Sequence, residues 1–197
     1  MGYTLMELQH VNVKLLVQKP DELDLEPLVP IFHNWIQGQV SEELLLDVAD
    51  YRHVSEGPGV VLIGHQANYS VDNTDNRLGV RYNRKAALEG SNQDRLKQAT
   101  RSALAACQRL ESEPGLRGKL RFNGQELELF INDRLVAPNV DATREAIEPE
   151  LRVFLQKLFG GSEYSLRYNS DPRGLFSVSI RASQAFSISD LLKNLPS

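Results

Sequence analysis

The chain has 197 residues, which fits a single domain, and 41% of them are hydrophobic, enough for a substantial core. No apolar run approaches the roughly 18 to 20 residues needed to cross a bilayer, and the N-terminus lacks the basic and apolar regions of a secretory signal. The single cysteine, Cys107, excludes an intrachain disulfide and a cysteine-based metal site. The composition therefore predicts a soluble, cytoplasmic protein with no membrane partner.

The net charge of −4 is unevenly distributed along the chain. Residues 1–76 contain 3 basic and 12 acidic side chains, whereas the remaining residues contain 19 basic and 14 acidic ones. Such an asymmetry can indicate a basic binding face, or two surfaces that neutralise each other when they pack. The second interpretation is favoured, because the chain is acidic as a whole and has no dense block of lysine and arginine.

The first half of the chain combines one helix with several strands. In chain order, the patterns predict a strand at 5–18, a helix over 27–37 with Asp24 as its cap, and strands at 41–54, 60–71 and 78–83. The range 41–54 can also be read as a helix, but alternating apolar residues favour a strand. The helix over 27–37 has Leu28, Ile31, Phe32, Trp35 and Ile36 on one face, which predicts its buried stripe.

In the second half, helices alternate with hairpins. Helices are predicted at 93–111 and 143–159, hairpins around Asn123-Gly124 and around residues 170–174, and a short helix at 187–195. Asn-Gly is the preferred pair for a type I′ turn, because both of its residues adopt positive φ there. That turn would pair Arg121 with Glu126 and Lys119 with Glu128. The turns at 73–76 and 170–174 would pair Val71 with Leu78 and Tyr168 with Phe176.

Hairpins between helices are typical of α+β architecture. We expect one α+β domain over residues 1–197, with an antiparallel sheet of about eight strands and three main helices on one face. A strand-strand-helix unit recurs over 60–111 and 118–159, with apolar helix positions at a constant offset, so an internal duplication is as plausible as coincidence. If the repeat is real, the loops at 84–91 and 132–140 leave the same end of the sheet.

Three similar tetrapeptides, VRYN at 80–83, LRFN at 120–123 and LRYN at 166–169, alternate apolar and polar residues. Strand alternation places the first and third residues of each toward the helices, and the arginines on the open face. The three arginines are Arg81, Arg121 and Arg167. Arginine on an open sheet face often only covers the sheet with its stem. The alternative is an anion site that combines Arg81 and Arg167, with Arg181 as a further candidate, with Asn68, Asn83 and Asn169.

All four histidines, at positions 10, 33, 53 and 65, lie in the first 65 residues. His65 is predicted to face the core, either as a structural histidine or as a general base lining a pocket. His10 falls inside the first predicted strand, and His33 falls on the polar side of its helix. No metal-binding spacing, nucleophile motif or phosphate loop is present, so neither a metal nor a cofactor is expected.

Three functions remain open. The favoured one is a non-catalytic module that binds a protein partner, or forms a homodimer, through the open face of the sheet. The second is a small-molecule-binding protein or small enzyme with a pocket around His65, Tyr82, Asn83 and Arg134. The third is an anion or nucleic-acid binder that uses Arg81, Arg84, Lys85 and Arg167. Nucleic acid is an unlikely partner, because the aromatic residues are predicted to face inward rather than to stack with bases.

Overall fold

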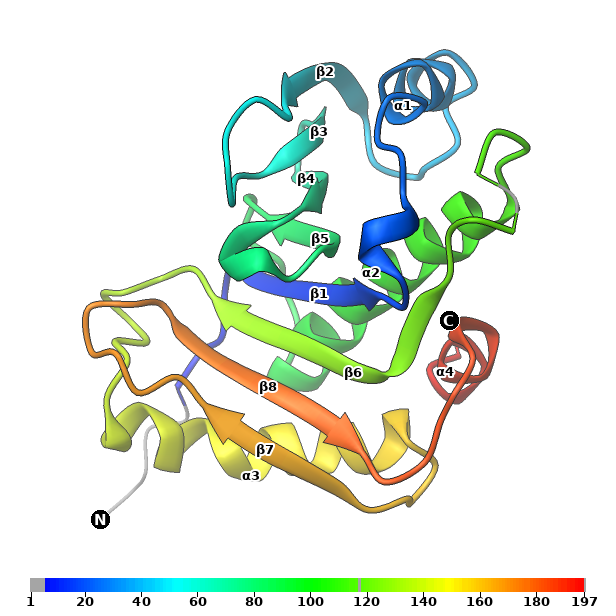
Figure 1. Cartoon of the computed structure of the whole chain (residues 1–197). Helices are drawn as coiled ribbons and strands as arrows, with labels where there is room; N and C mark the ends of the chain where they lie inside the picture. Colours follow the sequence, from blue (N-terminus) through cyan, green and yellow to red (C-terminus); the bar gives the residue numbers. More distant parts are fainter. Residues whose placement is uncertain (1–5, 117, 197) are drawn as a thin grey trace.

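A computed structural model describes residues 6–116 and 118–196, and within them the chain forms one eight-stranded antiparallel sheet and four α-helices (Figure 1). The strands are β1 (Val11–Val17), β2 (Leu45–Tyr51), β3 (Gly59–Gly64), β4 (Ala67–Asp72), β5 (Gly79–Arg84), β6 (Phe122–Ile131), β7 (Tyr164–Tyr168) and β8 (Phe176–Ala182). The helices are α1 (Leu28–Gln37), α2 (Asn92–Ser112), α3 (Asp141–Leu158) and α4 (Ile188–Asn194), with short 3-10 turns at Pro20–Glu22 and Thr74–Asn76. The strand order is β2-β3-β4-β5-β1-β6-β8-β7. The α+β prediction is confirmed, with four helices rather than three main ones.

The helices bury the apolar stripes that their sequences predict. In α2, the residues Ala99, Ala103, Cys107 and Leu110 are buried, and this helix packs against β1 and β5 at the centre of the sheet. Small alanine side chains let the helix approach the strands closely. In α3, Ile147, Leu151, Phe154, Leu155 and Leu158 are buried in the same way. None of the described helices is long and apolar enough to cross a membrane.

The opposite face of the sheet carries none of the described helices (Figure 1). Strand β1 occupies its centre, with Val11, Val13 and Leu15 toward the helices and Asn12, Lys14 and Leu16 on the open side. Every residue of β1 is nevertheless buried. Other parts of the chain therefore shield the centre of the open face from solvent.

The predicted hairpin at Asn123-Gly124 is wrong, because both residues belong to the continuous strand β6. Neither residue has a positive φ. Gly124 is instead required by a close backbone approach, since a Cβ there would lie 2.2 Å from the carbonyl oxygen of Phe186. The ion pairs predicted from that hairpin are absent from the described residues. Arg121 lies 3.8 Å from Glu111, and Glu126 pairs with Arg77 and Arg181.

The single strand predicted over 60–71 is also wrong, because β3 and β4 form a hairpin there with its turn at His65-Gln66. The turn is held by hydrogen bonds from the N–H of His65 to the Leu44 carbonyl (2.8 Å) and from the N–H of Lys85 to the Gln66 carbonyl (2.9 Å). His65 is therefore exposed rather than buried. Alternation that continues across a two-residue turn cannot be told from a single strand by pattern alone.

The predicted pairing registers of two hairpins are each wrong by two residues. Val71 pairs with Val80 rather than with Leu78, and Tyr168 pairs with Val178 rather than with Phe176. Since side chains alternate with a period of two, an error of two residues leaves each side chain on its predicted face. The three tetrapeptides accordingly keep their predicted orientation, with Tyr82 and Phe122 buried and Tyr168 half-buried.

The N-terminal elements differ at their boundaries. Residue 5 of the predicted first strand lies outside the described residues, and residues 6–10 are not a strand. His10 precedes β1 with a φ of 52°, so its predicted place inside the strand is wrong. Helix α1 starts after Pro27 without a side-chain cap, and Asp24 instead accepts a hydrogen bond from the N–H of Glu26 (2.9 Å). The exposed position predicted for His33 is confirmed.

Strands β5 and β6 flank β1 on either side, and both run antiparallel to it. They are therefore parallel to each other, and the loops at 85–91 and 132–140 leave the same end of the sheet, as predicted. This arrangement is compatible with a duplicated unit. The internal repeat itself stays a prediction.

A candidate binding face at the centre of the sheet

The six residues predicted as ligand contacts do not converge on one site. His65 and Arg134 are exposed in separate loops, and the ring of Tyr82 is buried on the helix side of the sheet. Arg81 and Asn83 neighbour Tyr82 in β5, so they point to the open face. Arg167 shares that face but lies on β7, separated from Arg81 by three strands, or roughly 19 Å at the usual strand spacing.

The structure does bring three asparagines together on the open face. Asn68 of β4 pairs with Asn83 of β5, which in turn pairs with Asn12 of β1. We call these three residues the amide row. It is continued on β6 by Phe130, the register partner of Asn12. The row crosses the two middle strands of the eight, so it marks the centre of the open face.

The amide row leaves much of its hydrogen-bonding capacity unused. Asn12 is 0% exposed, and neither its Oδ1 nor its Nδ2 has a partner in the described chain. The Oδ1 atoms of Asn68 and Asn83 are buried without a partner as well. A buried polar group without a hydrogen bond costs about 1–3 kcal/mol. Four buried polar atoms without a partner lie together in this row, and the fold itself does not explain why.

Arg81 lies beside this row. Its guanidinium carbon is 4.3 Å from the centroid of the Phe130 ring. Arg81 belongs to β5 and Phe130 to β6, so the arginine side chain crosses β1 between them and helps to cover Asn12. The Nε of Arg81 is buried without a partner, and the side chain forms no ion pair with any residue in the described ranges. Burial lowers the pKa of Arg81.

Asp72, Glu128 and Asp75 lie near enough to stabilise the charge of Arg81, and the first two are also engaged by other groups. Lys14, 1% exposed, donates to Asp72 at 2.5 Å, and Asp72 also accepts from the backbone N–H and the hydroxyl of Thr74. Arg77 pairs with Glu126 and, at 2.7 Å, with Glu128. The centre of the face thus combines satisfied ion pairs with one arginine and three amides that are not satisfied.

A second polar cluster, on the helix side, was not predicted from the sequence. Glu43, in the loop before β2, accepts hydrogen bonds from the hydroxyls of Tyr82 (2.7 Å) and Tyr69 (3.3 Å). Gln98 donates to the Tyr82 hydroxyl at 2.8 Å. Burial, together with Glu43, raises the pKa of Tyr82 to about 12 and raises that of Tyr69 further. These groups satisfy one another, so we interpret the cluster as an anchor for the 41–44 loop.

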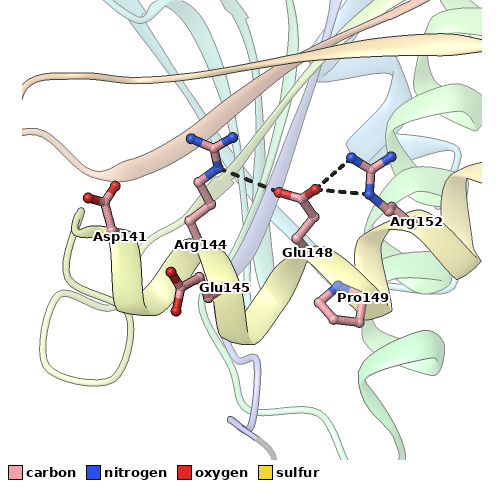
Figure 2. Close-up of a pocket in the computed structure, with 6 residues that line it drawn as sticks. All are labelled: Asp141, Arg144, Glu145, Glu148, Pro149 and Arg152. Carbon is pink, nitrogen blue, oxygen red and sulfur yellow. Dashed lines mark hydrogen bonds and ion pairs between the residues drawn. The ribbon is translucent and has the colours of Figure 1, made fainter.

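An open groove of about 700 Å³ lies on α3 (Figure 2). Glu148 lies between Arg144 (3.5 Å) and Arg152 (2.6 Å) and accepts a hydrogen bond from the Tyr168 hydroxyl. The hydrogen bond from Arg152 is the main cause of the lowered pKa of Glu148. Glu148 pairs with both arginines, and Asp141 and Glu145 line the same groove, so the groove offers no excess of positive charge to an anionic ligand.

Among the described residues, no group of three or more His, Cys, Asp or Glu side chains could hold a metal ion. No protein-family model, curated protein or solved structure matches this chain. The centre of the open face is where the described chain leaves most of its hydrogen-bonding capacity unused, and the candidate site is placed there.

Proposed function

We propose that this chain is a non-catalytic binding module that docks a protein partner on the open face of its sheet. One observation carries the proposal: the amide row and Arg81 are buried with unused hydrogen-bonding capacity, on a face that none of the described helices covers. A partner can reach the half-buried side chains of Asn68, Arg81 and Asn83 and bond their accessible N–H groups, whereas Asn12 is 0% exposed. Central, poorly solvated polar and arginine side chains are also typical of the energetically important part of an interface.

The partner could be a second copy of the chain or a different protein. In a two-fold dimer, the centre of the face would lie against its own copy. Arg81 would then approach a second Arg81, while Asp72 and Glu128 on each side are already paired with Lys14 and Arg77. Like charges facing each other in a poorly solvated interface cost several kcal/mol. The charge pattern therefore favours a different protein over a homodimer.

The two other functions have weaker support. A pocket that joins Tyr82 to Asn83 would require one site to reach both faces of the sheet, because adjacent strand residues point to opposite sides. A nucleic-acid site would require several free cations, whereas the centre of this face also carries Asp72, Glu126 and Glu128. Both functions stay predictions.

The test compares three forms of the chain as bait in cell extract. Asn83→Arg would place a bulky cation at the centre of the open face, and Glu145→Arg would make a comparable change on exposed α3. We expect a defined protein to be retained by the unmodified chain and by Glu145→Arg, and to be lost with Asn83→Arg. Circular dichroism would verify that both variants fold.

Light scattering of the purified chain would complete this test. We expect the mass of a single chain, 22.2 kDa. A dimer that Asn83→Arg dissociates would assign the face to self-assembly instead. Equal retention of the partner by both variants would contradict the proposed docking face.

A further inference from the structure

The two edges of the sheet differ in how they are protected. Strand β2 forms one edge and β7 the other (Figure 1). The register of β2 with β3 contains a bulge between Leu45 and Asp47, and Asp47 itself accepts a hydrogen bond from the N–H of Val48 (2.8 Å). Bulges and charged side chains are devices that keep an edge strand from pairing with another chain. In β7, by contrast, all five residues pair with β8 in an unbroken register, and only Arg167 is charged.

The outer side of β7 presents main-chain groups that have no partner. At the end of the β7–β8 ladder, the N–H of Asn169 donates to the Ser177 carbonyl (3.0 Å). Because an antiparallel pair forms hydrogen bonds at every second residue, the N–H and C=O groups of Tyr164, Leu166 and Tyr168 point away from β8. These groups form no hydrogen bond within the described part of the chain. Donors and acceptors spaced in this way along a strand match the main chain of a second extended segment.

A groove runs beside this edge. Tyr164, Leu166 and Tyr168 lie on the helix side of the sheet, where they are half-buried and pack against the core. The Tyr168 hydroxyl donates to Glu148 (3.0 Å), and the Tyr164 hydroxyl donates to the Arg152 carbonyl (3.4 Å). Since Glu148 and Arg152 also line the open groove on α3, the groove lies next to the last strand (Figure 2). A strand added to β7 would therefore have one of its faces covered by α3.

We propose that the edge of β7 binds an extended segment of a partner protein, which adds one more strand to the sheet. The segment would alternate apolar and polar side chains. Those opposite Tyr164, Leu166 and Tyr168 would be apolar, because they would extend a half-buried apolar row above α3. Those between them would be polar, because they would share the open face with Arg167, which is exposed. This edge is separate from the docking face proposed above, and the proposal does not depend on that face.

A second copy of the chain fits this edge less well. If β7 paired with its own copy about a two-fold axis, the two α3 helices would come to lie side by side. Packed helices need an interaxial distance of roughly 8–10 Å, whereas neighbouring strands are only roughly 4.8 Å apart. The long side chains of Arg144, Glu148 and Arg152 would have to fit between the two helices. A segment of another protein brings no second α3 to this space.

A peptide that copies residues 175–183 provides the probe, because β8 is the strand that β7 already accepts on its inner side. The acetylated and amidated peptide would be added to the ¹⁵N-labelled chain in a nuclear magnetic resonance titration. We expect saturable shifts of the backbone N–H signals of Tyr164, Leu166 and Tyr168. The N–H signals of the residues between them should shift less, because they already bond to β8. Binding at another surface would not produce this alternation.

Two N-methylated forms of the peptide are a matched pair that leaves the protein unchanged. Methyl groups on the amides copied from Val178 and Ile180 would remove two donors that face β7, so binding should weaken about tenfold or more. Methyl groups on the amides copied from Ser177 and Ser179 would face solvent, and the affinity should stay the same. Equal affinity of the two forms would overturn the proposal, as would the absence of saturable shifts with the unmethylated peptide.

Variants of the chain test the same edge from the other side. Leu166→Pro removes the central outward N–H of β7, whereas Leu166→Ala shortens the same side chain and keeps that N–H. We expect Leu166→Pro to bind the peptide about tenfold more weakly than Leu166→Ala, with circular dichroism verifying that both fold. Asn83→Arg should bind the peptide normally, which separates this edge from the docking face. A dimer in light scattering that Leu166→Pro dissociates would show that a second copy occupies the edge, and the assignment to a partner segment would be wrong.

Discussion

Lys14 shows how a charged residue becomes part of a protein interior. It alternates with valines and leucines in β1, so its stem lies flat on the sheet, and its ammonium group meets Asp72 at 2.5 Å. Both side chains are almost fully buried, at 2% and 4% exposure. Burying either charge alone would be costly, whereas the pair compensates much of the desolvation.

We predict that Lys14→Met lowers the free energy of unfolding by about 3 kcal/mol, because it leaves the buried Asp72 carboxylate without its cation. Urea denaturation would measure the change. The matched control is Arg173→Met, which breaks the exposed pair of Arg173 with Asp171. That variant should show no measurable change. A similar loss in both variants would mean that burial does not determine the contribution of the Lys14–Asp72 pair.

The raised pKa of Tyr82 predicts that the free energy of unfolding falls at alkaline pH. Burial raises its pKa to about 12, from an ordinary value near 10, so the folded state favours the protonated phenol. This stabilisation is complete below pH 10, where the unfolded chain is protonated too, and it is lost as the pH rises through about 12. Unfolding free energies measured across this range should fall more steeply for the unmodified chain than for Tyr82→Phe. Parallel curves would show that Tyr82 does not contribute.

At the scale of the elements, Gly124 decides how β6 meets the segment before α4. We predict that Gly124→Ala lowers the free energy of unfolding by about 1–3 kcal/mol, because the new Cβ would lie 2.2 Å from the carbonyl oxygen of Phe186 and force the backbones apart. Thermal unfolding would detect the change. Gly115→Ala is the control, since its Cβ would meet its nearest neighbour at 3.9 Å. Equal stability of the two variants would disprove the proposed role of the close approach.

The errors in the predicted elements share one cause. Local patterns describe which face a residue occupies, but not which partner strand lies opposite. Asn123-Gly124 has the local signature of a turn, yet the strand continues because β1 and β8 provide partners for β6 on both sides. Tertiary pairing overrides local turn preference in this case. Helices were predicted closely, because their hydrogen bonds are local.

At the scale of the whole molecule, the acidic and the more basic parts of the sequence occupy different regions of the sheet. The acidic residues 1–76 form β2, β3 and β4 at one end of the sheet together with the central β1, while the more basic remainder forms β5 to β8. The two parts meet where β5 lies between β4 and β1, and ion pairs of Arg84 with Glu43 and of Arg95 with Glu7 join them. These pairs compensate part of the asymmetry, and the interpretation that two surfaces neutralise each other stays a prediction.

The candidate site could be predicted only in part. Alternation in VRYN indicated that Arg81 and Asn83 share the open face, and the structure agrees. The place of Asn12 beside Asn83 could not be predicted, because it depends on β1 lying between β5 and β6, which are far from it in sequence. Glu43 was missed for the same reason, since its partners Tyr69 and Tyr82 come from other strands.

The sequence by itself determined the α+β class, the helices, and the face on which each strand residue lies. These properties follow from the helical and strand periods, which act over a few neighbouring residues. Only the tertiary structure decided the strand order, the registers, and the meeting of three asparagines with an arginine that has no ion pair within the described chain. Those features depend on contacts between distant segments, and many alternative pairings satisfy the same local pattern.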